Sequence, residues 1–145
     1  MYELFRRHDE GLRTKLRGMT SPPRPTPGEL EILRVLWERG PSTVREVQES
    51  LGPARAAGYT TVLKLLQIMS EKALVTRDET ARAHVYAARV PETQTQRQLV
   101  RDLVDRAFGG SAAQLVVQAL SGRRASPEEI EDIRKLLDEI EGGKR

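Results

Sequence analysis

The segment from Gly58 to Met69 constrains the fold most, because its apolar residues share one side only if it is helical. These residues recur three and four positions apart, as on the buried stripe of an α-helix: Val62, Leu65, Leu66 and Met69. The opposite side is mostly polar and starts at the first turn: Tyr59, Thr60, Thr61, Leu63, Lys64 and Gln67. We therefore predict a helix from about Tyr59 to Lys72 with one side buried and the other free to bind.

Two shorter helices are predicted before this segment, each beginning at a Thr-x-x-Glu capping box. The boxes are Thr26 to Glu29 and Thr43 to Glu46, in which threonine and glutamate each satisfy a free amide of the first turn. Gly-Pro pairs at 40–41 and 52–53 end the two helices. Apolar residues follow each cap at helical spacing: Leu30, Ile32, Leu33, Leu36 and Trp37, then Val44, Val47 and Leu51.

A β-hairpin is predicted next, from two short extended runs at 74–78 and 84–88 joined by residues 79–83. Three helices followed by a hairpin are the layout of a winged helix-turn-helix, which places its third helix in the major groove of DNA. Basic residues near the hairpin turn suit contacts with the sugar-phosphate backbone. The candidate DNA-binding residues are Arg45, Tyr59, Thr60, Thr61, Leu63, Lys64, Gln67, Arg77, Arg82 and His84.

The chain after Pro91 is predicted to form three amphipathic helices, the last two opened by Ser111 and Ser126. Only 38% of residues are hydrophobic and 4% aromatic, so part of the apolar surface is expected to need a partner chain. We predict a homodimer in which these helices form the interface, through Leu99, Leu103, Phe108, Leu115, Val116, Leu120, Ile130, Ile133, Leu137 and Ile140.

The fold class is thus mainly α with a small β-hairpin: a winged helix-turn-helix followed by a helical dimerisation segment. The predicted division is a flexible basic arm at 1–25, a DNA-binding domain at 26–90, a dimerisation domain at 91–141 and a tail at 142–145. The arm carries six basic residues against three acidic ones, although the whole chain has a net charge of only +3. A basic arm favours a polyanionic partner.

Several function classes are disfavoured by what the sequence lacks. Without cysteine there are no disulfides, thiolate metal sites or cysteine nucleophiles, and His8 and His84 have no triad-like surroundings. No apolar run is long enough to span a bilayer, and no signal-peptide pattern begins the chain. We expect a cytoplasmic protein that is not an enzyme, inserts in no membrane, and uses no metal or cofactor. Two alternatives stay open: a protein-docking winged helix without DNA binding, and an activator holding a small ligand.

From about Thr26 to Ile140 the sequence resembles the penicillinase-repressor family, BlaI/MecI/CopY. The resemblance is clearest at residues 30–37, 59–62, 71–75 and 82–86. It implies a homodimeric repressor on a palindromic operator of double-stranded DNA, with C-terminal helices that intertwine with those of the second chain. The arm at 1–25 has no counterpart in the family pattern.

Two departures limit what the resemblance carries over. The absence of cysteine excludes the thiolate copper site of the copper-responsive members. In the β-lactam-responsive branch, a membrane-bound sensor protease is the implied partner, and the repressor is cut within its dimerisation helices. The corresponding position falls near Gln118 and Ala119, which do not match the Asn-Phe bond cut in that branch. The inducing signal therefore stays open.

Overall fold

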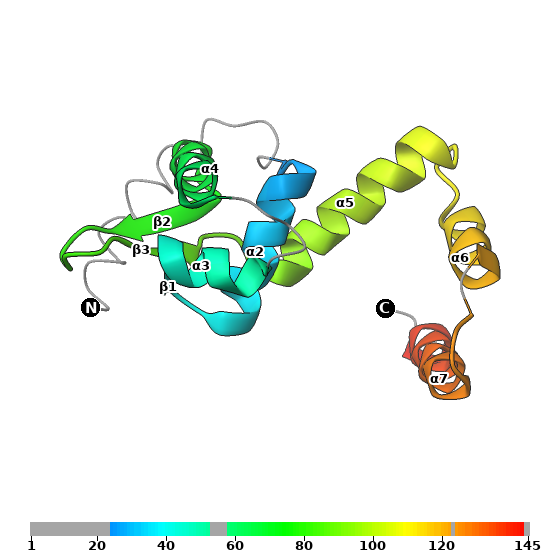
Figure 1. Ribbon diagram of the computed structural model, residues 1–145. Coiled ribbons are helices and arrows are strands. Elements are labelled where there is room, and N and C mark those ends of the chain that lie inside the picture. Colours follow the sequence, from blue (N-terminus) through cyan, green and yellow to red (C-terminus); the bar gives the residue numbers. More distant parts are fainter. Residues whose placement is uncertain (1–23, 53–57, 123, 144–145) are drawn as a thin grey trace. The chain divides into compact units, whose positions relative to one another are not determined.

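The computed structural model of this chain describes residues 24–52, 58–122 and 124–143. The predicted arm therefore lies almost wholly outside the described residues, as does the end of the predicted tail. The chain divides into two compact units, residues 1–99 and 100–145, which are described separately. The boundary between the units falls inside helix α5 (Glu92–Ala107), whose first turns belong to the first unit. Figure 1 labels the elements.

The first unit contains the three helices and the hairpin that the sequence predicts. Its elements are α2 (Pro27–Arg39), β1 (Ser42–Thr43), α3 (Val44–Leu51), α4 (Tyr59–Glu71), β2 (Val75–Asp78) and β3 (Val85–Ala88). The mainly α prediction with a small β part is confirmed, with boundaries within one or two residues of those expected. The left-handed backbone of Ala73, with φ of 62°, follows the last turn of α4 and turns the chain into β2.

Both capping boxes form as the sequence predicts. At the start of α2, Thr26 Oγ1 accepts from the amide of Glu29, and the amide of Thr26 donates to Glu29 Oε1 at 2.8 Å. At the start of α3, Thr43 and Glu46 exchange the same two bonds, at 3.2 and 3.0 Å. Thr43 also ends β1, so one residue joins the sheet to the helix.

The sheet has a third strand that the sequence analysis missed. β1 pairs antiparallel with β3, and the strand order is β1-β3-β2. Tyr86 at the centre of β3 lies opposite Ser42 on one side and Arg77 on the other. A two-residue strand carries no alternation to detect, because its identity depends on a partner more than forty residues away in sequence.

The core lies where α2, α3 and α4 pack on one another and on the sheet. Its buried apolar residues are Ile32, Leu33, Leu36, Val44, Val47, Val62, Leu66, Met69, Leu74, Val75 and Tyr86. Leu65 and Trp37, both expected in the core, are only partly buried. The indole N–H of Trp37 donates to the carbonyl of Val90 at 2.9 Å, which anchors α2 to the chain before α5.

A partly buried ion pair fixes the end of α4 to the start of α2. The side chain of Glu29 is 2% exposed, and its carboxylate accepts from Lys72 Nζ at 2.7 and 3.1 Å. Burial by itself raises the pKa of Glu29, but the bonds from Lys72 and Thr26 outweigh it and lower the pKa below its ordinary value. The capping glutamate of α2 therefore also sets the position of the helix that carries the candidate site.

The second unit continues α5 and adds α6 (Ala112–Gly122) and α7 (Pro127–Gly143). The predicted caps form: Ser111 Oγ accepts from the amide of Gln114, and Ser126 Oγ from that of Glu129. No described residue of α6 or α7 is buried. In the described parts of the chain, no helix has the length and apolar character needed to cross a membrane.

Candidate nucleic-acid interface

α4 exposes the polar side that the sequence assigned to it. Val62, Leu66 and Met69 are fully buried beneath the helix. Tyr59, Thr60, Thr61, Lys64 and Gln67 are exposed on its outer side, and Leu63 is partly exposed. The N-cap of the helix is Gly58, which forms no side-chain cap bond. The first amides of α4 therefore face outward without an internal acceptor from the cap, as in helix N-termini that bind phosphate.

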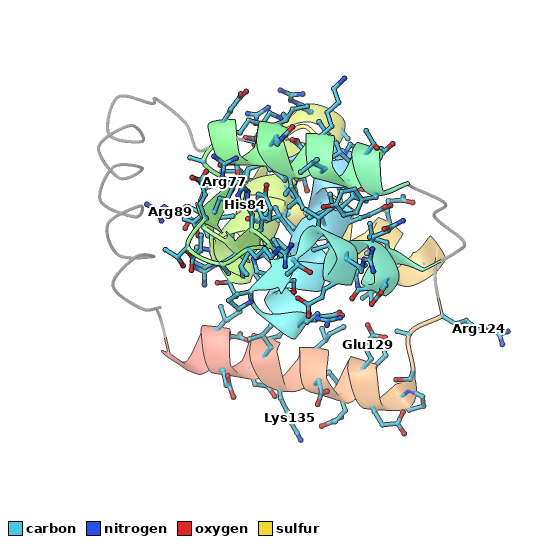
Figure 2. All side chains as sticks on the ribbon, turned by 60° about the vertical axis from the view of Figure 1, so that its left-hand side comes forward. Arg77, His84, Arg89, Arg124, Glu129 and Lys135 are labelled. Carbon is cyan, nitrogen blue, oxygen red and sulfur yellow. The ribbon has the colours of Figure 1, made fainter. Side chains whose placement is uncertain are left out.

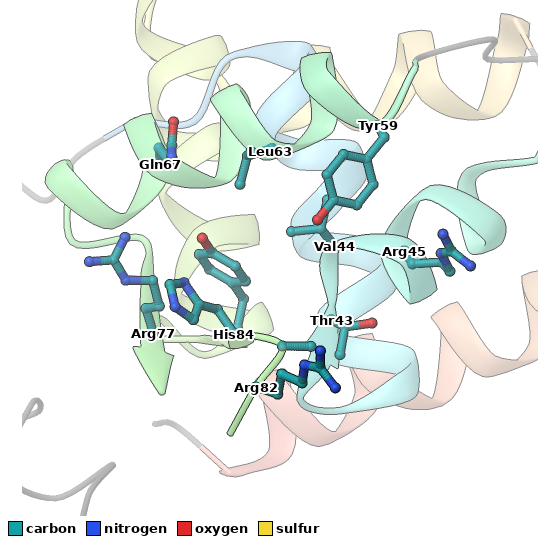
Figure 3. Close-up of a pocket in the computed structure, with 11 residues that line it drawn as sticks. Thr43, Val44, Arg45, Tyr59, Leu63, Gln67, Arg77, Arg82 and His84 are labelled. Carbon is teal, nitrogen blue, oxygen red and sulfur yellow. The ribbon is translucent and has the colours of Figure 1, made fainter. Parts of the chain in front are cut away.

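A groove of about 640 Å³ lies between α4, the start of α3 and the β2–β3 hairpin. In Figure 3, Tyr59 and Leu63 point from α4 into the groove, and His84 points into it from the hairpin. Arg77 points from β2 on the same side of the hairpin as His84, and Figure 2 labels both residues as well. The lining residues are Thr43, Val44, Arg45, Tyr59, Leu63, Gln67, Arg77, Arg82, Ala83, His84 and Tyr86.

The structure brings seven of the ten predicted DNA-binding residues into this one groove: Arg45, Tyr59, Leu63, Gln67, Arg77, Arg82 and His84. The other three, Thr60, Thr61 and Lys64, do not line it but lie exposed on the same helix. Their exposure leaves them free to contact a ligand larger than the groove.

The described residues that line the groove include basic side chains from α3, β2 and the hairpin turn and no acidic side chain. Arg45 on α3 and Arg82 and His84 on the hairpin are exposed. Arg77 forms an ion pair with Glu79, which lies in the hairpin turn. Because phosphate oxygens bind guanidinium groups in the same geometry as carboxylates, this surface suits a polyanion.

Sequence reasoning missed four lining residues: Thr43, Val44, Ala83 and Tyr86. Tyr86 is the most informative of them, because it is fully buried and yet borders the groove. The signal that could have identified Tyr86 is the alternation of side chains along the strand. His84 and Tyr86 are two residues apart and therefore share a face of the sheet, and Tyr86 lies opposite Arg77.

The predicted dimer residues lie on apolar surface that the single chain leaves uncovered. Leu103, Val116, Leu137 and Ile140 are 46–58% exposed. Phe108, Leu115, Leu120, Ile130 and Ile133 are partly exposed, as is Leu99 in the first unit. Val100, Val117 and Leu136, absent from the predicted set, are 47–54% exposed as well. The predicted cleavage residues Gln118 and Ala119 are exposed and helical, on α6.

The sequence model of the penicillinase repressor family matches residues 25–139. The chain belongs to this family. Among the relatives of this penicillinase repressor family member, the transcriptional regulator BlaI of Mycobacterium tuberculosis is 33% identical over 119 residues, covering 80% of this chain and 86% of that protein. The penicillinase repressor of Bacillus licheniformis is 22% identical over 123 residues, covering 85% and 96%.

Solved structures give a weaker likeness. The solution structure of the DNA-binding domain of the repressor BlaI is 23% identical, with a TM-score of 0.45, over 52% of this chain and 92% of that one. The monomeric form of Bacillus licheniformis BlaI, solved in complex with the blaP half-operator, matches with a TM-score of 0.44 at 23% identity over the same shares.

Proposed function

We infer that this penicillinase repressor family member is a DNA-binding transcriptional repressor, and we propose that it works as a cytoplasmic homodimer on an inverted-repeat operator. The observation that carries the proposal is the joint placement of an exposed polar helix side and a basic hairpin around one groove. The polar side of α4 offers base contacts, and the hairpin and α3 offer phosphate contacts. Repression follows from occupying DNA that the transcription machinery needs.

The residues divide by the part of DNA that each can contact. Gln67 can form a paired hydrogen bond with adenine, Lys64 can bind guanine or phosphate, and the methyl groups of Thr60 and Thr61 can meet thymine methyls. Arg45, Arg77 and Arg82 suit phosphates, which fix the register of the protein on the duplex but carry no sequence information directly. His84, beside Arg77 in the groove, is proposed as a further backbone contact.

The proposed dimer rests on the uncovered apolar side of the second unit. Apolar side chains half exposed along α6 and α7 gain stabilisation when a second copy covers them. Two-fold symmetry would then present two α4 helices to half-sites one or more DNA turns apart, roughly 34 Å or a multiple of it.

Release of the repressor by proteolysis is a further part of the proposal. A cut between Gln118 and Ala119 would separate α7, and with it Leu137 and Ile140, from the DNA-binding unit. The site is exposed but helical, so a protease would need the helix to open locally. A membrane-bound sensor protease would be the partner for this step.

The test is a nuclease footprint of the purified chain on the DNA upstream of its own gene. We expect two protected half-sites related by two-fold symmetry, with protection that weakens steeply as salt rises, because each phosphate contact releases counterions. Absence of any protected site at low salt would contradict the repressor proposal and favour the docking module instead.

A further inference from the structure

Two buried polar atoms without partners lie along the groove. Among the described residues, neither the hydroxyl of Tyr86 nor Nε of Arg77 has a hydrogen-bond partner, and both atoms have almost no accessible surface. Both residues line the groove and lie opposite each other across β2 and β3. A buried donor left unpaired costs about 1–3 kcal/mol, so two in one place need an explanation.

The sheet register explains how these atoms reach the groove. Val75 and Arg77 lie two residues apart on β2, and their side chains share one face of the sheet. Val75 belongs to the core, whereas Arg77 lies one step further toward the hairpin turn. On the neighbouring segment, Tyr86 likewise belongs to the core and His84 lies two residues nearer the hairpin turn. The same face of the sheet therefore borders the core at Val75 and the groove at Arg77, and Tyr86 belongs to both.

The side chains at the place where the groove meets the core favour an anion as ligand. Arg77 and Tyr86 are both donors there, with Arg82 and His84 exposed nearby. The nearby anionic group that the structure pairs with Arg77 is the Glu79 carboxylate. Glu79 is half exposed in the hairpin turn, so an incoming phosphate can replace it on the guanidinium without burying the carboxylate.

We propose that this groove holds one phosphodiester group of the DNA backbone, with Tyr86 and Arg77 as its innermost donors and Glu79 as the internal competitor that it displaces. The inference rests on the proposed DNA binding and adds to it a positioning role for a core tyrosine. The Tyr86 hydroxyl is covered in the free protein, so a groove side chain must turn aside before a phosphate oxygen can accept from it. Rotation of exposed side chains takes nanoseconds or less and does not limit binding.

The first test compares the full-length wild type with Tyr86→Phe on a 30-base-pair duplex of random sequence and on the footprinted DNA. We expect Tyr86→Phe to bind both about tenfold more weakly, because a phosphate contact carries no base information. The slope of log affinity against log salt should stay unchanged, since no charge is removed. Arg77→Ala, as the charged comparison, should lower that slope by about one.

Thermal unfolding of the free protein separates an effect of the substitution on DNA binding from an effect on folding. We expect Tyr86→Phe to melt at or above the wild-type temperature, because the hydroxyl has no partner to lose. Wild-type affinity in Tyr86→Phe would overturn the inference, whether or not its melting temperature falls, and leave the repressor proposal standing. Failure of the wild type to bind either duplex would instead contradict the repressor proposal itself.

The second test is a double-mutant cycle that asks whether Glu79 competes with phosphate for Arg77. Glu79→Gln should bind the random duplex several-fold more tightly than wild type, and this gain should disappear in the Arg77→Ala background. A gain of equal size in both backgrounds would mean that Glu79 acts only by general repulsion of DNA, and would contradict displacement from Arg77.

Discussion

At the residue scale, Glu29 shows how one side chain serves both local and tertiary structure. It closes the capping box of α2 and pairs with Lys72 at the end of α4. Because its pKa is lower in the folded chain than in the unfolded one, its carboxylate stabilises the fold above the ordinary pKa of 4.5. That stabilisation is lost as the pH falls through the pKa of the folded state.

We predict that Glu29→Gln lowers the free energy of unfolding by about 1–3 kcal/mol at pH 7. Glutamine can keep the capping bond to Thr26, so the loss reports on the ion pair. Urea unfolding at several pH values should show the difference from wild type shrinking as the pH drops below 4.5. Glu49→Gln, at an exposed position, should change stability by less than about 0.5 kcal/mol. A pH-independent difference for Glu29→Gln would contradict this assignment.

Arg82 tests the proposed backbone contact of the hairpin. Arg82→Ala should weaken binding to specific and random DNA equally and reduce the salt slope by about one. Fluorescence anisotropy at four salt concentrations gives both quantities. Arg34→Ala, the same charge change at an exposed position on α2 outside the groove, should leave both unchanged. A loss confined to the specific sequence would show that Arg82 contacts bases rather than phosphate.

At the element scale, we propose that the uncapped start of α4 contributes to DNA binding through its free amides. Gly58 has φ of −67° and open space where a Cβ would lie, so other residues fit there. Gly58→Asp should cap the helix, keep the fold and weaken DNA binding by about 1–2 kcal/mol, because the carboxylate competes with phosphate for the free amides. Gly58→Ser is the matched control, with a neutral cap. Equal DNA affinities for the two variants would mean that no phosphate lies at this helix end.

The helices and the hairpin could be predicted because their signals are local. The start of a helix is indicated within four residues by each of the caps Thr26, Thr43, Ser111 and Ser126. The spacing of the apolar residues then predicts which face is buried. The pairing of Ser42 with Tyr86 and of Glu29 with Lys72 depends on residues more than forty positions apart. No periodicity marks such contacts, so the third strand was missed.

The candidate site was predictable in the same measure. The exposed side of α4 follows from its buried side, since both come from one helical period. The groove itself does not, because it depends on how the hairpin packs against α4. Tyr86 was missed for that reason: a tyrosine in a strand is usually a core residue, and the second role that we propose for it follows from its position beside Arg77.

At the scale of the whole molecule, assembly decides whether two α4 helices can bind DNA together. Leu137 is 58% exposed in the single chain, so Leu137→Asp should leave the monomer folded. In the proposed dimer the same change buries an unpaired charge, which costs about 3–5 kcal/mol. Sedimentation should show a dimer for wild type and a monomer for Leu137→Asp at micromolar concentration. Lys135→Ser, at an exposed position on the same helix, should stay dimeric; a monomeric wild type would contradict the dimer.

The most direct measurement of the central proposal is the affinity of the double variant Lys64→Ala/Gln67→Ala for the footprinted DNA and for a random duplex. If α4 contacts bases with its exposed side, affinity for the footprinted sequence falls by about 1–3 kcal/mol for each residue. Random DNA should be bound nearly as by wild type, apart from any phosphate contact of Lys64. Full-strength binding of the footprinted DNA by the double variant would contradict the placement of α4 in the major groove.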